Sequence, residues 1–379
     1  MKLKNLFSPG KIGTVYIKNR IIRSATWTAK ATNEGYVTDD LINLFKDLAE
    51  GGTGLIISGY LAVDPSGAAT HNMACLYDDS YISGQKKLVK TVHDFSEVKI
   101  AAQIAHTGNG AFIFGNTNFE PVGPSSMINL ILKKPCRELT TEEVRQIIKN
   151  FVDTGRRAYE CGYDMVQIHG SHGYLLSDFV SPYTNKRTDE FGGNFQKRSQ
   201  ILVDIYNQLR EDVDKNFPIF IKLNTKDYLQ EGLTLEEGKE IAKLLIEIGY
   251  DAIEPSSGRY DLKFSKRKTY PSVMVKSGEN QNYFLQNVLK LKPIMKDRPI
   301  ILQGGVRDPL IMEDFLKDDI ADFIALSRPL IYEPNLPNRW KDGDLTPPLC
   351  TNCNGCLTVA ATDTLYCIVK NQLEGKQDL

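Results

Sequence analysis

Short apolar runs rich in β-branched residues alternate along the chain with longer segments in which apolar residues recur at helical spacing. A short apolar run is typical of a buried strand, and an apolar face that repeats with the helical period is typical of a helix against a core. The runs occupy residues 20–26, 54–58, 99–104, 164–169, 218–223, 252–255, 299–303 and 322–325. Helix-like segments between them include residues 38–50, 140–161, 195–216, 234–248 and 283–295.

Local end signals support two of these helices. Thr140 and Thr234 each stand just before a pair of acidic residues. The hydroxyl satisfies free backbone N–H groups, and the acids favour the helix dipole. Gly162 and Gly249 follow the ends of the same segments, where glycine commonly caps a helix.

Eight strands that alternate with helices indicate parallel β/α units. A doubly wound open sheet and a closed barrel both fit this alternation. The count of eight favours the barrel, and no Gly-x-Gly-x-x-Gly motif follows the first strand, where an open nucleotide-binding sheet would need it. We therefore predict an α/β fold, a (β/α)8 TIM barrel with a short N-terminal hairpin at residues 1–345, followed by a cysteine-rich C-terminal extension at residues 346–379.

Composition limits the class of protein. The 379 residues are 41% hydrophobic and 25% charged, and the formal net charge is −1. This balance is typical of a soluble globular protein and gives no global field for nucleic acid or an anionic membrane. No apolar run approaches the roughly 18 residues of a membrane span, and no apolar stretch of a secretory signal follows the basic N-terminus. We expect a cytoplasmic protein without nucleic-acid or membrane partners, and a homo-oligomer is one option.

The chemistry of such barrels lies where the strands end, because the loops that follow meet at one mouth. The last two strands end in Gly304-Gly305 and in Ser327-Arg328. Glycines let backbone N–H groups approach a phosphate, and an arginine adds charge, so these two ends together predict a phosphate site. Taken alone, Gly304-Gly305 would also fit a tight turn.

Two middle strands end in polar residues that suit a flat redox heterocycle. Gln103 can both donate and accept hydrogen bonds. Lys222 follows an apolar run, and a buried lysine is costly unless it faces an anion. A redox cofactor that gains negative charge on reduction would be such a partner.

The stretch HGSHGYLLSDFV, residues 169–180, places two of the five histidines and a tyrosine directly after a buried strand. Polar, titratable side chains at that point indicate chemistry rather than packing. Zinc binding by His169 and His172 is one alternative, although no carboxylate or thiol lies beside the pair to complete a ligand set. A purely structural, glycine-rich loop is another.

The longer run HGSHGYLLSDFVSPYTNKRTDEFGGNFQKR, residues 169–198, resembles the signature of the Old Yellow Enzyme family, the FMN-dependent NADH:flavin oxidoreductases. The similarity extends from Leu6-Phe7 and Asn19-Arg20 through the run Gln103-Ile104-Ala105-His106 to Ser327-Arg328, and so covers nearly the whole barrel. The resemblance implies a TIM barrel with FMN bound noncovalently at the strand ends. It also implies that reduced FMN passes a hydride to an activated double bond.

The resemblance also implies roles for individual residues. His169 and His172 match the pair that hydrogen-bonds the carbonyl or nitro oxygen of the substrate, and Tyr174 matches the proton donor to the other alkene carbon. These three would be both catalytic and substrate-binding. The residues expected to hold FMN are Ser24, Ala25, Thr26, Trp27, Tyr60, Gln103, Lys222, Gly304, Gly305, Ser327 and Arg328.

Three of these positions depart from the family pattern. Lys222 stands where many relatives carry arginine, so it keeps the charge but loses the bidentate fork. Trp27 stands where cysteine or threonine is common, and Tyr60 where a small alanine is common. The two large aromatics leave the flavin potential and the shape of the pocket open, whereas FMN binding itself is still expected.

Four of the seven cysteines fall close together near the C-terminus in a C-x2-C-x2-C-x10-C pattern, and the scattered Cys75, Cys136 and Cys161 are expected to be reduced thiols. Four thiolates at such spacing suit iron–sulfur or zinc chemistry. The pattern resembles that of the 2,4-dienoyl-CoA reductase and trimethylamine dehydrogenase branch, where a 4Fe–4S cluster passes electrons to FMN from a pyridine-nucleotide-binding part. The chain stops at residue 379, so we expect no such second part, and a cluster, zinc and reduced thiols all stay open. The four cysteines are Cys350, Cys353, Cys356 and Cys367.

Three functions are compatible with these patterns. The first is an ene-reductase, in which NAD(P)H reduces FMN and FMN reduces a small-molecule acceptor, an α,β-unsaturated carbonyl or nitro compound. The second is an iron–sulfur flavoprotein, an enoate or amine oxidoreductase that exchanges electrons with a partner protein. The third is an electron-transfer subunit with no substrate of its own, which the intact group of His169, His172 and Tyr174 disfavours.

Overall fold

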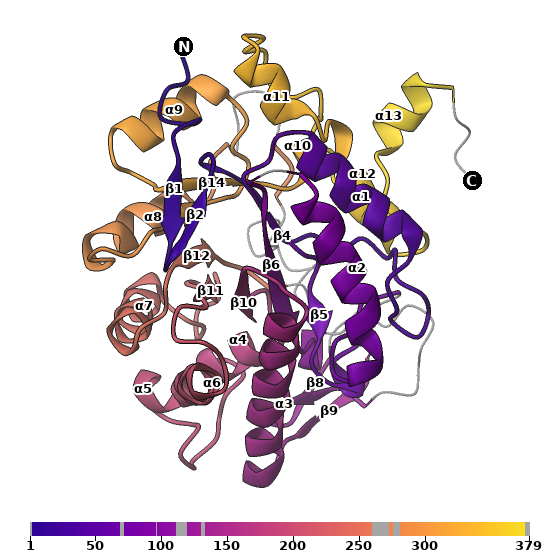
Figure 1. The fold of residues 1–379 in the computed structure, drawn as a ribbon. Helices are drawn as coiled ribbons and strands as arrows, with labels where there is room; N and C mark the ends of the chain where they lie inside the picture. The colour runs from indigo at the N-terminus through magenta and orange to yellow at the C-terminus, as the bar shows by residue number, and fades with distance from the viewer. Residues whose placement is uncertain are drawn as a thin grey trace.

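A computed structural model describes residues 2–68, 72–95, 97–110, 120–129, 133–259, 273–275 and 281–375. Eight parallel strands form its centre, in the neighbour order β12-β11-β10-β6-β4-β3-β14-β13. A parallel bridge between Ile253 and Ile300 joins the two ends of this path, so the predicted (β/α)8 barrel is confirmed (Figure 1). The strands are β3 (Ile21–Arg23), β4 (Leu55–Ile57), β6 (Lys99–Ala105), β10 (Met165–Gly170), β11 (Ile219–Asn224), β12 (Ile253–Ser256), β13 (Ile301–Leu302) and β14 (Phe323–Leu326).

Helices surround these strands on the outside (Figure 1). Short 3-10 turns supplement them at η1 (Pro65–Gly67), η2 (Asp79–Tyr81), η3 (Gly108–Gly110) and η4 (Lys292–Ile294). The helices are α1 (Asp39–Glu50), α2 (Ile82–His93), α3 (Thr141–Glu160), α4 (Leu175–Val180), α5 (Phe195–Arg198), α6 (Gln200–Asp212), α7 (Leu235–Ile248), α8 (Leu285–Leu291), α9 (Pro309–Lys317), α10 (Arg328–Tyr332), α11 (Leu336–Lys341), α12 (Gly355–Ala360) and α13 (Ile368–Leu373).

The end signals read from the sequence act as expected. Thr140 accepts from the backbone N–H of Glu143, whose side chain accepts in return from the backbone of Thr140, which is a complete capping box at α3. Thr234 caps α7 through its side chain alone, which accepts from the N–H of Glu237. Gly162 and Gly249 take positive φ values of 87° and 124°, where a side chain would be strained.

Two predicted helices are shorter or broken. The segment 195–216 divides into α5 and α6 at Ser199, whose hydroxyl donates to the carbonyl of Phe195 and so competes with the helical backbone bond. The segment 283–295 is helical only from Leu285 and continues as the 3-10 turn η4, because Pro293 has no N–H to donate.

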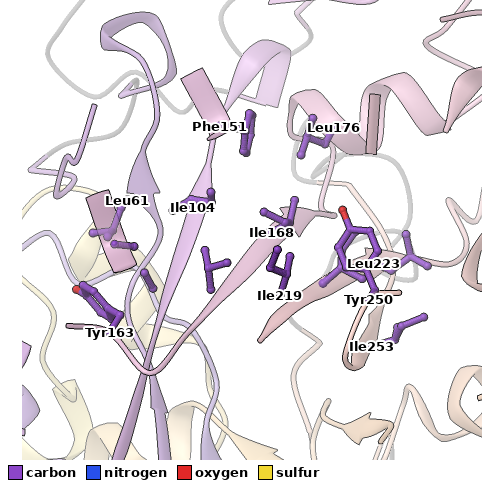
Figure 2. Packing of buried hydrophobic residues seen from close by; sticks show 14 of the residues in the cluster. Leu61, Ile104, Phe151, Tyr163, Ile168, Leu176, Ile219, Leu223, Tyr250 and Ile253 are labelled. Carbon is purple, nitrogen blue, oxygen red and sulfur yellow. The ribbon is translucent and has the colours of Figure 1, made fainter. Parts of the chain in front are cut away.

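The core has two layers. One fills the inside of the barrel and includes Phe220 and Phe323, and the other lies between the strands and the helices. Figure 2 shows part of the outer layer, in which Ile104 and Ile168 lie near Phe151 of α3. Such residues are expected to contribute roughly 1.5–3 kcal/mol each through burial.

The predicted N-terminal hairpin is present and closes one end of the barrel. Strands β1 (Gly10–Ile12) and β2 (Val15–Ile17) pair antiparallel, and Ile12 and Ile17 join the interior layer. The hydroxyl of Thr14 at the turn donates to the carbonyl of Asn216, just before β11. Because the hairpin blocks the amino ends of the strands, the carboxyl ends are left to form a site.

Smaller elements lie beside the barrel. Strand β5 (Leu61–Ala62) pairs with β6, and a three-stranded sheet is made of β7 (Val122–Gly123), β8 (Met127–Ile128) and β9 (Pro135–Glu138). In the cysteine-rich extension, α13 projects from the outside of the molecule (Figure 1), and residues 376–379 lie outside the described part. Among the described residues, no helix combines the length and apolarity needed to cross a bilayer.

Candidate active site

Side chains from four strands meet inside the barrel at its carboxyl end. His169 of β10 is in register with Lys222 of β11, which is in register with Glu254 of β12. Gln167 is in register with Gln103 of β6. Residues in register on neighbouring parallel strands point to the same face, so all five side chains gather on the inner face. All five are buried.

A chain of hydrogen bonds connects most of this group. Gln103 Nε2 donates to Gln167 Oε1 over 2.6 Å, and Gln167 Nε2 donates to Glu254 Oε2 over 2.7 Å. Lys222 Nζ lies 2.7 Å from Glu254 Oε1 and 3.1 Å from Ser24 Oγ. Ser24 in turn donates to Glu254 over 2.8 Å. The chain crosses the barrel from the end of β3 to β12 and β6.

This network revises the expected partner of Lys222. The sequence led us to expect that a cofactor would supply the anion, whereas Glu254 supplies it within the protein. Glu254 and Gln167 were both missed, because each was counted only as part of a buried strand. A signal was available: an acid within the apolar run at residues 252–255 and a lysine within the run at 218–223 each need a buried partner.

The residues of the HGSHGY stretch form an aromatic cluster. The rings of His169 and Tyr60 stack with centroids 6.1 Å apart, and His172 and Tyr174 meet His169 edge-on at 5.1 and 5.0 Å. The hydroxyl of Tyr174 donates to that of Tyr60 over 3.1 Å. The structure therefore brings together the three predicted catalytic residues and Tyr60.

Both histidines are neutral near pH 7. Burial and, secondarily, the charge of Lys222 lower the pKa of His169 to about 3. Burial, followed by the closeness of His169 and Lys222, lowers the pKa of His172 well below its usual value. A neutral imidazole offers one donor and one acceptor nitrogen. Within the described residues, the buried Nδ1 of His169 has no hydrogen-bond partner, so it is available to a ligand.

The backbone turns sharply at His172, and polar neighbours hold its ring. His172 and Gly173 have φ values of 70° and 75°, a left-handed conformation that is uncommon for a residue with a side chain. His172 Nε2 lies 2.7 Å from Ser256 Oγ, which also accepts from Gln303 Nε2 over 3.1 Å. Because Ser256 accepts from Gln303, its own proton is available to the histidine.

The predicted phosphate site combines a tight backbone turn at Gly304 and Gly305 with the side chain of Arg328. Gly304 and Gly305 have φ values of 100° and 78°, and a Cβ at either would come within 3.0 Å of the ring of Tyr283. Arg328 Nη1 donates to the carbonyl of Val273 over 3.0 Å and to Asn354 Oδ1 over 2.5 Å. The side chain of Arg328 thus connects the end of β14 to the cysteine-rich extension, a contact that sequence reasoning missed.

The remaining predicted cofactor residues follow β3 and β14. Thr26 Oγ1 and Ser327 Oγ lie 2.7 Å apart, and Ala25 packs against the interior core. Trp27 and Tyr60 line one cavity together with residues of α1 and α2. Of these positions, Tyr60 contacts the histidine cluster, and Thr26 and Ser327 follow the carboxyl ends of β3 and β14.

The four extension cysteines are free thiols in different environments. Cys350 is buried, Cys356 and Cys367 are half-buried, and Cys353 is exposed. Burial, followed by the charge of Cys350, raises the pKa of Cys356 to about 11, and Cys353 and Cys367 also lie near enough to contribute. Over the described residues, no three His, Cys, Asp or Glu side chains form a ready-made metal site, here or at His169 and His172.

Comparison with known proteins decides the family. A family model described as NADH:flavin oxidoreductase / NADH oxidase matches residues 5–346. The chain belongs to this family. The match confirms the resemblance drawn from the sequence and the FMN cofactor that it implied.

The chain is also similar to individual proteins, each over nearly its whole length. The chain is 35% identical over 359 residues to an NADH oxidase of Thermoanaerobacter brockii, covering 93% of this chain and 53% of the relative. It is 30% identical over 378 residues to a cinnamate reductase of Clostridium sporogenes, covering 93% of this chain and 55% of that relative. A solved structure of 2-naphthoyl-CoA reductase superposes with a TM-score of 0.89 at 28% identity, covering 99% of this chain and 58% of that one. The chain thus spans about half the length of these relatives.

The residues at the mouth fit FMN. The buried amide of Gln103 donates to Gln167, so its oxygen is left to accept from a heterocycle. The unpartnered Nδ1 of His169 leaves a polar atom for a substrate bound against that heterocycle. At Gly304 and Gly305 the rings of Tyr283 and Phe284 leave no room for a Cβ, and the positive φ of both glycines turns the backbone tightly at the end of β13.

Proposed function

We propose that this chain is an ene-reductase that uses FMN to transfer a hydride from NAD(P)H to the activated C=C bond of an α,β-unsaturated carbonyl or nitro compound. The observation that carries the proposal is the cluster of His169, His172 and Tyr174, in which two neutral imidazoles and a phenol share one mouth. An electron-transfer subunit would need no such cluster. The family match and the likeness to a cinnamate reductase support the same chemistry.

The proposal assigns the cofactor to residues 1–345 of the chain. Bound FMN supplies hydride transfer, accepting a hydride from one substrate and passing it to the next. The isoalloxazine would be held by Ser24, Ala25, Thr26, Trp27, Tyr60, Gln103 and Lys222, and the phosphate by Gly304, Gly305, Ser327 and Arg328.

His169 and His172 would bind the oxygen of the acceptor. Because burial keeps both rings neutral, each can donate one hydrogen bond without carrying a charge. A donor aimed at an oxygen that gains negative charge stabilises the transition state more than the bound substrate. Ser256 and the turn at His172 would hold one ring in place for this task.

Tyr174 would hold the proton that the acceptor takes up on its other alkene carbon. Its hydroxyl donates to Tyr60 over 3.1 Å, which fixes the phenol oxygen in place, and the proton would turn from Tyr60 toward the acceptor to be delivered. The ring is buried and packs edge-on against His169, which limits its rotation. The hydroxyl is therefore positioned beside the histidines that would bind the acceptor's oxygen.

Cofactor release followed by turnover tests the proposal. Heating the purified protein should release FMN, identified by chromatography, and recovery of FAD would contradict a site with one terminal phosphate. A separate, unheated sample that retains its FMN should oxidise NADH or NADPH in the absence of oxygen when 2-cyclohexen-1-one or a nitroalkene is added. Failure with every activated alkene in a broad panel would refute the ene-reductase proposal.

A second candidate is favoured by the extension at residues 346–379. Four free cysteines lie there, and Arg328 connects this segment directly to the strand ends. We propose the alternative that these cysteines hold a 4Fe–4S cluster through which a partner protein exchanges electrons with the enzyme. Iron and sulfide analysis of anaerobically purified protein tests it. Zinc alone, or no metal, would leave the ene-reductase proposal as the single candidate.

A further inference from the structure

Glu254 stands at the centre of the buried network below the mouth. Its carboxylate accepts three hydrogen bonds with donor distances of 2.7 to 2.8 Å, from Lys222, Ser24 and Gln167. Glu254 has no exposed surface, and Lys222 is 3% exposed. With water excluded, the interaction between the two charges is much stronger than in solvent, and neither is screened by salt.

The pairing changes what Lys222 presents to the mouth. A lone buried lysine would present a full positive charge to any ligand above it. Joined to Glu254 over 2.7 Å, Lys222 forms a pair with no net charge, which acts outward only as a dipole. The electrical potential above Lys222 is therefore set by the carboxylate as much as by the ammonium group.

The carboxylate also fixes the direction of the hydrogen-bond chain. An ionised Glu254 can only accept, so Gln167 must turn its NH2 group toward it and its oxygen toward Gln103. Gln103 must then turn its NH2 group toward Gln167 over 2.6 Å. The amide oxygen of Gln103 is left to face other partners, where it would accept from an N–H of a heterocycle.

We propose that Glu254 is a positioning residue that lowers the reduction potential of FMN by neutralising Lys222 and orienting the amide of Gln103. The inference rests on the proposed placement of FMN beside these two residues. Taking up two electrons and one proton leaves FMN with one more negative charge than before. An uncompensated lysine would favour this reduced form. The negative end of the Gln103 amide, its oxygen, would disfavour the added negative charge, although it can accept from the ring N–H in both forms. Glu254 neutralises the charge of Lys222 and, through Gln167, holds the Gln103 amide with its oxygen toward the flavin.

The test is the midpoint potential of bound FMN in three variants, measured anaerobically by reductive titration against a reference dye. Glu254→Gln removes the negative charge at nearly the same volume and should raise the potential. The affinity ratio of reduced to oxidised FMN should rise at least tenfold, which is about 30 mV for a two-electron couple. Lys222→Met should lower the potential below that of the wild type. The double variant, which removes the pair together, should lie between the single variants.

Glu313→Gln is the matched control. Glu313 is also a buried acid, but it accepts from Asn5 and from the backbone of Leu6, outside the mouth. Its substitution should reduce stability and leave the potential unchanged. An unchanged or lowered potential in Glu254→Gln, with FMN still bound, would overturn the proposal without affecting the ene-reductase function.

If Glu254→Gln fails to retain FMN, the midpoint potentials of Lys222→Met and of the double variant are compared instead. The double variant removes both charges and is expected to fold, since replacing a buried pair as a unit is well tolerated. The two variants are compared at about pH 9, because an unpaired buried carboxylate takes up a proton at lower pH. A higher potential in the double variant than in Lys222→Met supports the role of Glu254, and equal potentials overturn it. If wild-type protein binds no FMN, the proposed function fails instead.

Discussion

The hydroxyl of Tyr174 donates to the hydroxyl of Tyr60 over 3.1 Å, and the ring of Tyr60 stacks on His169. Tyr60 stands where the family resemblance led us to expect a small alanine, so this contact comes from a feature of this chain. The tyrosine proposed to deliver the proton is therefore oriented by a second tyrosine, which also fills part of the pocket above His169.

Tyr60→Phe should slow the reaction of reduced enzyme with an enone by up to about tenfold, because one hydrogen bond that orients Tyr174 is lost. The ring and its stacking are retained, so FMN content should be unchanged. Stopped-flow mixing of reduced enzyme with 2-cyclohexen-1-one measures the rate. Tyr77→Phe is the control, since Tyr77 accepts from Tyr81 over 2.7 Å in another tyrosine pair outside the mouth. Equal rates in the wild type and both variants would refute the orienting role.

His172→Ala should slow the same reaction by about 10²-fold, corresponding to roughly 3 kcal/mol for one lost donor to a developing oxyanion. Binding of phenols, which would place their oxygen at the histidine pair, should weaken as well and can be followed by titration of the flavin absorbance. His93→Ala is a control, because His93 bonds to Asp164 away from the mouth. Unchanged phenol binding in His172→Ala would place the acceptor's oxygen elsewhere.

Stability should fall on acidification because His169 stays neutral in the folded state. The pKa of His169 is about 3 when folded, against the ordinary value of 6.5, so between these values the unfolded chain binds the extra proton. The free energy of unfolding is therefore lost as the pH falls below about 6.5, at up to about 1.4 kcal/mol per pH unit for this group. Urea unfolding between pH 4.5 and 8 should show a shallower decline in His169→Asn. Parallel curves for the two proteins would contradict the buried neutral histidine.

Arg328→Ala should lower the fraction of protein that carries FMN and also loosen the extension, because Arg328 contacts Asn354 as well as the strand end. Flavin content per protein and the rate at which a thiol reagent labels the extension cysteines measure the two effects. Arg339→Ala breaks contacts to Thr346 at the start of the extension without touching the strand ends, so it should affect labelling alone. Full FMN content in Arg328→Ala would show that the phosphate lies elsewhere.

The fold was predictable because the patterns that indicate its strands and helices lie within short segments of the sequence. Each of the eight strands is a short apolar run, and caps such as Thr140 depend on neighbours three residues away. The errors also have local causes, namely the hydroxyl of Ser199 and the missing N–H of Pro293, which change a helix without changing its apolar pattern.

The site was only partly predictable. His169, His172 and Tyr174 stand together in the sequence, and the resemblance gave them roles that the structure leaves as proposals. The apolar runs around Lys222 and Glu254 indicated that each needs a buried partner, but not which one, because Glu254 and Ser24 reach Lys222 from separate strands. The contact of Arg328 with the extension was hidden for the same reason.

The most direct test of the account separates the two half-reactions in Tyr174→Phe. Reduction of FMN by NAD(P)H needs no proton from Tyr174, whereas reduction of an enone does. Stopped-flow measurement should therefore show FMN reduction at the wild-type rate and enone reduction slowed by at least about tenfold. Equal slowing of both half-reactions, or of neither, would contradict the role of Tyr174 as proton donor and with it the proposed ene-reductase site.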